Sequence, residues 1–329
     1  MSNRKWSLGL IVLVIVFGYI LIQFFFSTMK INDLVRRMGP DKTVESSVKY
    51  VVLISQELDN AFWREMEKGA GNEAEKLGMK LVYMGPIRSN VSEQIRLLEK
   101  SIALKPDAIM VQGIADPDYE QLINKAVDQG IPVITVDADE PSSRRLAYVG
   151  TDNRAAGKQM GELVLKDHAG SGKIGVIIGS EMSDSQRLRL EGFRSVITSV
   201  PGMEIVDIRA SNISHIGAAK QTRDMLSHYK EIETIVGFSS LDAGGILEGV
   251  KAMGKQGVRV YGFDNLEITR QGIAQGEIIA SIVQQPQEIG SKSIDLLSGL
   301  FKGDKLTGQY FIPTYVLDQA QMQGGGISP

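Results

Sequence analysis

The stretch that decides the fold runs from Ile131 to Leu163 and reads IPVITVDADEPSSRRLAYVGTDNRAAGKQMGEL. It opens with an apolar run, Ile131–Val136, which is too short for a helix and is bounded by Gly130 and Asp137. Such a run is typical of a strand that is buried on both faces of a parallel sheet. Asp137 therefore stands just past the carboxyl end of a strand, where open α/β sheets bind their ligands.

The same stretch continues into a predicted change of sheet. A loop containing Pro141 leads to a second short apolar run, Ala147–Val149, and then to Gly150-Thr151-Asp152-Asn153, which reads as a turn or crossover. Asn153 is placed to cap the helix that follows it. We expect the chain to leave one sheet for another here, so that the whole chain forms two lobes around a shared crevice.

From Tyr50 onward, short apolar runs alternate with amphipathic stretches, which is the rhythm of βα units and a parallel sheet. Further strands are predicted at 50–55, 80–84, 108–111, 173–178, 204–209, 234–238, 258–263, 280–284 and 310–317. Helices are predicted at 61–77, 92–105, 117–129, 154–168, 185–200, 216–229, 243–253 and 286–301. This length exceeds one comfortable core, which favours two lobes. The alternative is a single (β/α)₈ barrel of about 250 residues, for which the strands are too many.

The N-terminus carries a predicted membrane anchor. Residues 8–26 are apolar except for Gln23 and small residues, and as a helix they are just long enough to cross roughly 30 Å of hydrocarbon. No small-x-small site follows, which favours an uncleaved anchor over the alternative, a cleaved signal peptide. Residues 1–29 are therefore assigned to a tip and a transmembrane helix, and the polar residues 30–48 to a stalk. Charges on the two flanks nearly balance, so charge alone leaves the orientation open.

Composition excludes several classes of protein. The net charge is −3, so no large basic surface argues for a nucleic-acid partner. The chain has no cysteine, which excludes disulfides, thiolate zinc sites, a cysteine nucleophile and a lipid-anchored N-terminal cysteine.

Two glycine motifs resemble cofactor loops, but neither predicts one. Residues 69–74 match a dinucleotide-binding pattern, yet they fall inside the predicted helix 61–77 instead of directly after a strand, so they read as small residues for close packing on the sheet. Residues 170–173 resemble a phosphate loop, but Ile174 stands where Ser or Thr is required. No cofactor is expected.

Metal and catalytic signals are also weak. The three histidines, His168, His215 and His228, lack the spacing of metal ligands. No GxSxG elbow occurs, and no two carboxylates stand out as an acid and base pair. We therefore expect neither a metal site nor an enzyme.

Four polar residues stand at or just after the ends of predicted strands: Asn60, Asp137, Asp264 and Gln284. Taken singly, each has an ordinary explanation, as a helix cap, two turn formers and a hinge residue. Taken together, they predict amides and carboxylates that face one cleft, flanked by Phe62 and Trp63.

That mixture of side chains suits a sugar. Each hydroxyl both donates and accepts, so Asp, Asn, Gln and Arg can satisfy adjacent hydroxyls, while the C–H faces of a pyranose pack on aromatic rings. Arg189 can donate several hydrogen bonds in a fixed fork. A surface ion pair on the predicted helix 185–200 is the alternative for this residue.

The body resembles the type I periplasmic binding proteins of the ribose, galactose and xylose group. The resemblance covers about Tyr50 to Leu317 and rests on motifs that occur in the family's order. They are Asp59-Asn60-Ala61-Phe62-Trp63, Gly130-Ile131-Pro132-Val133-Ile134-Thr135-Val136-Asp137, Gly150-Thr151-Asp152-Asn153 with Gly157, Arg187-Leu188-Arg189-Leu190-Glu191-Gly192-Phe193, Tyr261-Gly262-Phe263-Asp264 and Gln284-Gln285-Pro286.

The resemblance implies an α/β fold of two doubly wound parallel-sheet lobes, joined by three hinge crossovers near 151–153, 284–286 and 312–314 and preceded by the transmembrane helix. It implies an N-terminal lobe of residues 49–151 plus 285–312, a C-terminal lobe of 152–284 plus 313–320, and a flexible tail at 321–329. It also implies that Asn60, Phe62, Trp63, Asp137, Arg189, Asp264 and Gln284 contact a sugar.

Three positions depart from the ribose-binding pattern. Ala138 stands where an arginine usually follows the aspartate, Leu241 stands where an asparagine usually precedes Asp242, and Ile213 replaces an aromatic residue. These differences remove hydrogen bonds and stacking that would hold ribose. They favour a xylose-like pentose or another monosaccharide.

The resemblance also implies a place and a role. Domains of this group work outside the cytoplasmic membrane, which makes the N-terminal tip cytoplasmic and the body extracytoplasmic on a single-pass anchor. Related DNA-binding repressors carry a helix-turn-helix where this chain has its apolar run, which argues against a repressor. Two outputs remain open: delivery of sugar to the permease of an ABC importer, or signalling to a membrane sensor histidine kinase. A sugar-converting enzyme on the same scaffold is a third class, and no acid and base pair supports it.

Overall fold

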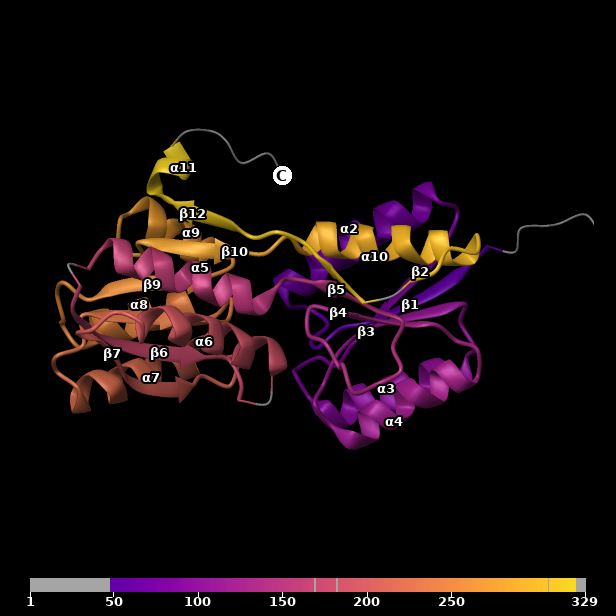
Figure 1. Ribbon diagram of the computed structural model, residues 1–329, viewed down its shortest axis with the longest axis horizontal. Coiled ribbons are helices and arrows are strands. Elements are labelled where there is room, and N and C mark those ends of the chain that lie inside the picture. The colour runs from indigo at the N-terminus through magenta and orange to yellow at the C-terminus, as the bar shows by residue number, and fades with distance from the viewer. Residues whose placement is uncertain (1–47, 169, 182, 307, 324–329) are drawn as a thin grey trace, which may run out of the picture. The chain divides into compact units, whose positions relative to one another are not determined.

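The computed structural model describes residues 48–168, 170–181, 183–306 and 308–323 (Figure 1). The predicted anchor and nearly all of the predicted stalk, residues 1–47, lie outside the described residues, as does the end of the predicted tail, 324–329. Within the ranges given above, none of the helices combines the length and the apolar character that crossing a membrane requires.

One six-stranded parallel sheet is built mainly from the first part of the described chain, in the order β11-β5-β4-β3-β1-β2. Its strands are β1 (Tyr50–Ile54), β2 (Lys80–Met84), β3 (Ala108–Gln112), β4 (Val133–Val136), β5 (Ala147–Gly150) and β11 (Gln309–Phe311). On one side lie α2 (Ala61–Lys76) and α10 (Pro286–Phe301), and on the other α3 (Val91–Ala103) and α4 (Pro117–Asp128) (Figure 1). This is a doubly wound lobe, which we call the N-terminal lobe.

A second six-stranded sheet has the order β12-β10-β9-β8-β6-β7. Its strands are β6 (Gly172–Ile178), β7 (Met203–Ala210), β8 (Thr234–Gly237), β9 (Arg259–Phe263), β10 (Ala280–Val283) and β12 (Tyr315–Asp318), and only β12 runs antiparallel. The helices of this C-terminal lobe are α5 (Asn153–Lys166), α6 (Asp184–Ile197), α7 (His215–His228), α8 (Asp242–Ala252), α9 (Glu267–Ala274) and α11 (Gln319–Gln323). The order 7-6-8-9-10 repeats the order 2-1-3-4-5, so β9 is the counterpart of β4.

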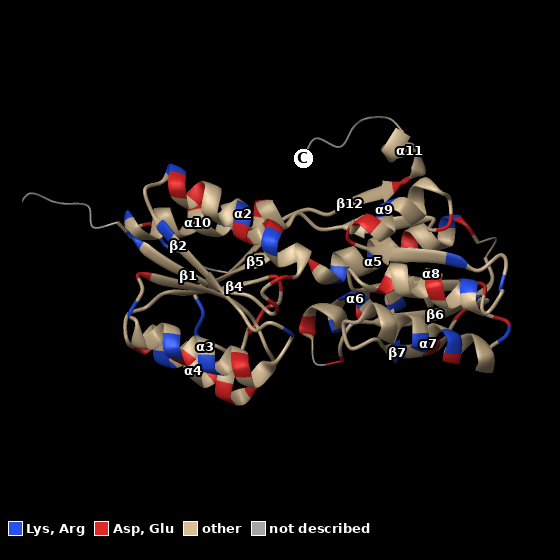
Figure 2. Cartoon of the chain, turned by 180° about the vertical axis from the view of Figure 1, so that it is seen from behind, with Lys and Arg blue, Asp and Glu red and all other residues tan. Residues whose placement is uncertain are grey.

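Each sheet is covered by a hydrophobic core on both faces. Successive residues of β1 point to opposite faces, so Val51 joins the core under α2 and α10, whereas Val52 joins the core under α3 and α4. In the C-terminal lobe the neighbouring residues Val176 and Ile177 of β6 likewise join two different cores, one on each face of the sheet. Charged side chains lie mainly on the helices and loops around the sheets, with both signs interspersed (Figure 2).

Glycines bring pairs of helices into close contact. A Cβ added at Gly69 of α2 would lie 2.1 Å from the carbonyl oxygen of Gln287 in α10, and one added at Gly290 would lie 2.2 Å from an oxygen of α2. Gly157 of α5 and Gly192 of α6 make the equivalent approach in the other lobe. The 69–74 motif thus serves packing: Gly69 allows the close approach to α10, and Ala70 and Ala74 belong to the core between α2 and the sheet, as expected.

Most predicted elements occur within a few residues of their predicted bounds, and two expectations are wrong. The run 310–317 is not one strand, because β11 pairs with β5 in one sheet and β12 pairs with β10 in the other. Asn153 is not the cap of α5, since the carboxylate of Asp152 accepts the hydrogen bond from the amide of Ala155. The short helices α9 and α11 were not predicted, and α11 includes residues 321–323, which the sequence assigned to the tail.

Candidate ligand-binding site

The carboxyl ends of strands from both sheets meet at one narrow cavity, with a volume of about 50 Å³. All of the residues predicted from the sequence line it: Asn60, Phe62, Trp63, Asp137, Arg189, Asp264 and Gln284. The first four come from the N-terminal lobe and the last three follow α5 in the chain. The structure therefore brings together side chains that lie far apart in the sequence.

Asp137 and Asp264 occupy equivalent places in the two lobes. Asp137 directly follows β4 and Asp264 directly follows β9, and both have left-handed backbones, with φ of 64° and 63°. Asp tolerates this conformation better than most residues, and strained backbone is common where ligands are held. The repeated topology thus presents one carboxylate from each lobe to the same cavity.

Asp137 is buried, and its partners are few. The side-chain amide of Gln112 donates to Oδ2 at 2.9 Å, and the hydroxyl of Tyr148 lies 2.8 Å from the backbone oxygen of Asp137. Burial raises the pKa of Asp137 to about 6, although the nearby charge of Arg189 opposes this. A ligand hydroxyl that donates to this carboxylate would stabilise its ionised form.

Asp264 accepts hydrogen bonds from Gln284 in the adjacent crossover. The backbone amide and the side-chain Nε2 of Gln284 both lie 3.2 Å from its carboxylate. Burial raises the pKa of Asp264, and Arg189 again opposes the shift. The cavity thus contains two buried carboxylates that share one cation.

Arg189 is only 3% exposed, so the surface ion pair considered as its alternative does not form. Its guanidinium donates to three acceptors, the side-chain oxygens of Asn153 and Gln284 and the carbonyl of Phe238, at 2.8–2.9 Å. It also stacks 3.9 Å from the ring centre of Phe263. Burial lowers its pKa. These contacts fix the position of the Arg189 guanidinium, which lowers the entropic cost of binding a ligand to it.

The start of α2 supplies the apolar wall. Asn60 is the helix cap, since its side-chain oxygen accepts from the amide of Phe62 at 3.0 Å, and it lines the cavity as well. The rings of Phe62 and Trp63 meet edge to face, with centres 5.8 Å apart. Trp63 also belongs to the core beneath α2, so its position is fixed by packing.

Residues 51–305 match the family described as "Periplasmic binding protein domain". The chain belongs to this family. Its two-lobed α/β architecture with largely parallel sheets is the fold that the sequence motifs implied.

Several relatives in the periplasmic binding protein family cover most of the chain. GanP, a glucose-galactose binding protein from Geobacillus stearothermophilus, is 35% identical with a TM-score of 0.81, and the similarity covers 84% of this chain and 99% of that one. The XylFII–LytSN complex contains a chain that is 30% identical, with a TM-score of 0.78 and coverage of 83% and 98%. The ribose import binding protein RbsB of Escherichia coli strain K12 is 23% identical over 285 residues, 85% of this chain and 95% of the relative.

Sequence reasoning missed other residues that line the cavity. They are Gln56, Gln112, Ser183, Ser185, Gln186, Ser239 and Ser240. Gln112 ends β3 and Ser239 follows β8, so the strand-end rule that identified Asp137 could have found them too. Of the positions that depart from the ribose-binding pattern, Ile213 lines the cavity, whereas Ala138 and Leu241 do not.

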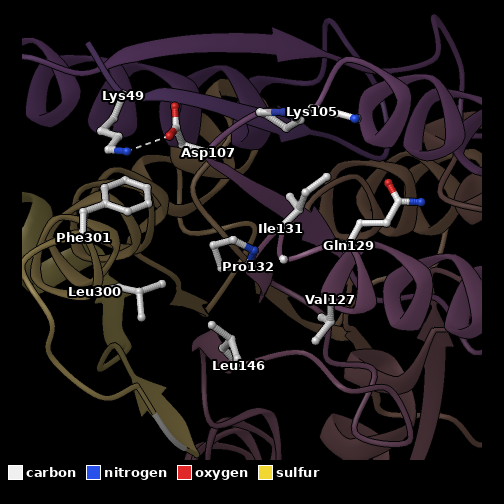
Figure 3. Close-up of a pocket in the computed structure, with 12 residues that line it drawn as sticks. Lys49, Lys105, Asp107, Val127, Gln129, Ile131, Pro132, Leu146, Leu300 and Phe301 are labelled. Carbon is white, nitrogen blue, oxygen red and sulfur yellow. Dashed lines mark hydrogen bonds and ion pairs between the residues drawn. The ribbon is translucent and has the colours of Figure 1, made fainter. Parts of the chain in front are cut away.

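A second, broader cavity of about 1020 Å³ lies at the amino ends of the N-terminal sheet (Figure 3). Lys49 there pairs with Asp107 at 2.8 Å and lies over the ring of Phe301, while Leu146 and Leu300 form an apolar part of its lining. Open α/β sheets bind ligands at the opposite, carboxyl ends. The smaller cavity is therefore the candidate site.

No group of three metal-binding side chains occurs in the part of the chain that the structure describes. His168 contacts the hydroxyl of Thr234 at 2.8 Å, and Nδ1 of His215 lies 3.5 Å from Glu248. No histidine is among the described residues that line the candidate site.

Proposed function

We propose that this protein is a membrane-anchored, extracytoplasmic sugar-binding protein whose two lobes close on a monosaccharide. The observation that carries the proposal is the narrow cavity with one carboxylate from each lobe, a fixed guanidinium, amides and two aromatic rings. Sugar hydroxyls pair with the polar groups, and the C–H faces pack on Phe62 and Trp63. The names of GanP and RbsB, which refer to glucose-galactose binding and ribose import, support the same ligand class.

The proposed lobes are residues 49–151 plus 285–312 and residues 152–284 plus 313–320, which exchange between open and closed forms. Hydrogen bonds join the three proposed crossovers, which supports their acting together as one hinge. Thr151 donates to Gln284, and Gln285 donates to the carbonyl of Pro313. Thr314 in turn donates to Gln159 of α5. A sugar favours the closed form only by the difference in its affinity for the two states.

The ligand that we favour is a pentose or a similar monosaccharide. Ala138 cannot supply the guanidinium that an arginine would add beside Asp137, so the site has fewer donors than the ribose-binding pattern. A different set of donors suits a sugar whose hydroxyls are arranged differently from those of ribose.

Thermal denaturation of the full chain in detergent, with a panel of pentoses and hexoses, tests the proposal. A sugar at a hundred times its Kd adds about 2.7 kcal/mol to the free energy of unfolding. Asp264→Ala should abolish this response, because it removes the carboxylate that the C-terminal lobe presents to the cavity, and circular dichroism checks that the variant is folded. Asp107→Ala, in the broader cavity, is the matched control and should respond like the wild type. Full response of Asp264→Ala would contradict the proposed site.

Two outputs fit this site, and the relatives' names support both. RbsB is named as an import protein, which supports delivery to the permease of an ABC importer, while XylFII occurs in a complex with LytSN, which supports a protein partner other than a permease. The apolar run 8–26, proposed as a single-pass anchor, suits a receptor for a membrane sensor histidine kinase. Purification from detergent distinguishes them, since the importer predicts a bound permease and the receptor a bound kinase.

A further inference from the structure

Ile213 has the least expected backbone conformation in the described part of the chain. Five non-glycine residues there have positive φ: Lys105, Asp137, Asn212, Ile213 and Asp264. Asp and Asn enter the left-handed region comparatively easily, but a β-branched residue does so only under strain. Ile213 has φ of 50°, and its neighbour Asn212 has φ of 56°.

The surroundings hold Ile213 in this conformation. Its backbone amide donates to the carbonyl of Gly179 at 2.9 Å. Gly179 has no side chain, and a Cβ added there would lie 3.2 Å from Cγ1 of Ile213 and 2.9 Å from Cβ of Ser239. The glycine therefore makes the room that the isoleucine side chain occupies.

Ile213 also differs from its neighbours in chemistry. It lines the candidate site, and the other lining residues of the C-terminal lobe that the structure describes are all polar or charged: Ser183, Ser185, Gln186, Arg189, Ser239, Ser240, Asp264 and Gln284. Glycine or asparagine would adopt this backbone at lower cost. Local stability therefore does not explain an isoleucine here, whereas a contact with a ligand would.

We propose that Ile213 determines which sugars the site accepts, an inference that rests on the sugar-binding function proposed above. Ile213 forms an aliphatic contact from the C-terminal lobe and faces a carbon that bears no hydroxyl. The preferred class is thus a pentopyranose or a deoxy sugar over the hexose that carries one hydroxyl more. A hydroxyl placed against Ile213 would lose its hydrogen bonds to water and find no partner.

Pairs of sugars that differ at one carbon test this inference: D-xylose with D-glucose, and D-fucose with D-galactose. Affinities of the full chain in detergent are measured by titration calorimetry. The comparison is made for each pair in which at least one sugar binds. The wild type should bind the sugar without the extra hydroxyl about ten- to a hundredfold more tightly, which is the usual discrimination of an apolar pocket. Ile213→Ser should reduce this preference below about threefold, and Ile213→Val should keep it.

Two glycine variants separate specificity from strain. Ile213→Gly and Asn212→Gly both remove a strained left-handed residue, so both should raise Tm. Only Ile213→Gly should also lose the preference between paired sugars, because Asn212 does not line the site. If sugars bind and Ile213→Ser keeps the full preference, the role of Ile213 is refuted while the proposed function stands. If no sugar binds the wild type, both fail.

Discussion

Lowering the pH from 7 to 5 should weaken ligand binding through Asp137. Burial raises the pKa of this carboxyl to about 6 from the ordinary value of 3.8. If sugar hydroxyls donate to it, the ionised form binds, and that form falls from roughly nine-tenths of the molecules at pH 7 to roughly one-tenth at pH 5. Affinity should therefore fall about tenfold.

The stability of the ligand-free protein should change in the opposite direction. Between the ordinary pKa and about 6, the folded protein keeps the proton on Asp137 while the unfolded chain has lost it. Stability therefore falls as the pH rises through this window, by up to about 3 kcal/mol at about 1.4 kcal/mol for each unit of pKa shift. Burial also raises the pKa of Asp264 and of Asp242, which adds to this change with the same sign.

Calorimetric titration and urea unfolding at pH 5, 6 and 7 measure the two effects. Asp137→Asn should make the pH profile of affinity shallower, and any remaining slope reports Asp264. Asp242 is the matched control, because burial raises its pKa to about 6 but it does not line the cavity. Asp242→Asn should alter the stability profile alone. Equal affinity of the wild type at pH 5 and pH 7 would refute the assignment of Asp137 as an ionised acceptor.

Three further changes test the structure around the site. Tyr148→Phe removes a hydroxyl that lies 2.8 Å from the backbone oxygen of Asp137, so the affinity measured by calorimetry should fall about three- to tenfold. Tyr261→Phe is the control, because Tyr261 does not line the site, and it should leave the affinity unchanged. Gly290→Ala places a Cβ 2.2 Å from a backbone oxygen of α2, and urea unfolding should show a loss of about 1–3 kcal/mol. Arg145→Met leaves Asp139 buried without its ion-pair partner, and the same assay should show a loss of about 3–5 kcal/mol.

The strand-end rule explains why much of the site could be predicted. The short apolar runs ending at 136 and 263 have no helical period, and in parallel sheets such strands end at one edge. Asp137 and Asp264 could therefore each be placed at the carboxyl edge of its own sheet, and the expected division into two lobes around one crevice placed both edges at the same cleft. Their equivalence could not be predicted, because it depends on the strand orders 2-1-3-4-5 and 7-6-8-9-10.

The errors occurred where tertiary contacts decide between local alternatives. Asp152 and Asn153 are both good helix caps. The side-chain oxygen of Asn153 accepts a hydrogen bond from Arg189, and the carboxylate of Asp152 caps α5 instead. The run 310–317 looks like one strand because its residues favour extended backbone. Pro313 in its middle was a usable signal, since proline cannot donate to a ladder.

Gln284 shows why hinge and ligand cannot act independently in this protein. Its side-chain oxygen accepts from Thr151 in the first crossover and from Arg189 in the cavity, while its Nε2 donates to Asp264. One side chain thus joins two crossovers to two charged groups of the site. A rotation of the lobes that breaks the bond to Thr151 changes the partners available to Arg189. Conversely, a ligand that accepts from Arg189 or donates to Asp264 changes the energy of that rotation, which is the differential interaction that a shift between open and closed forms requires.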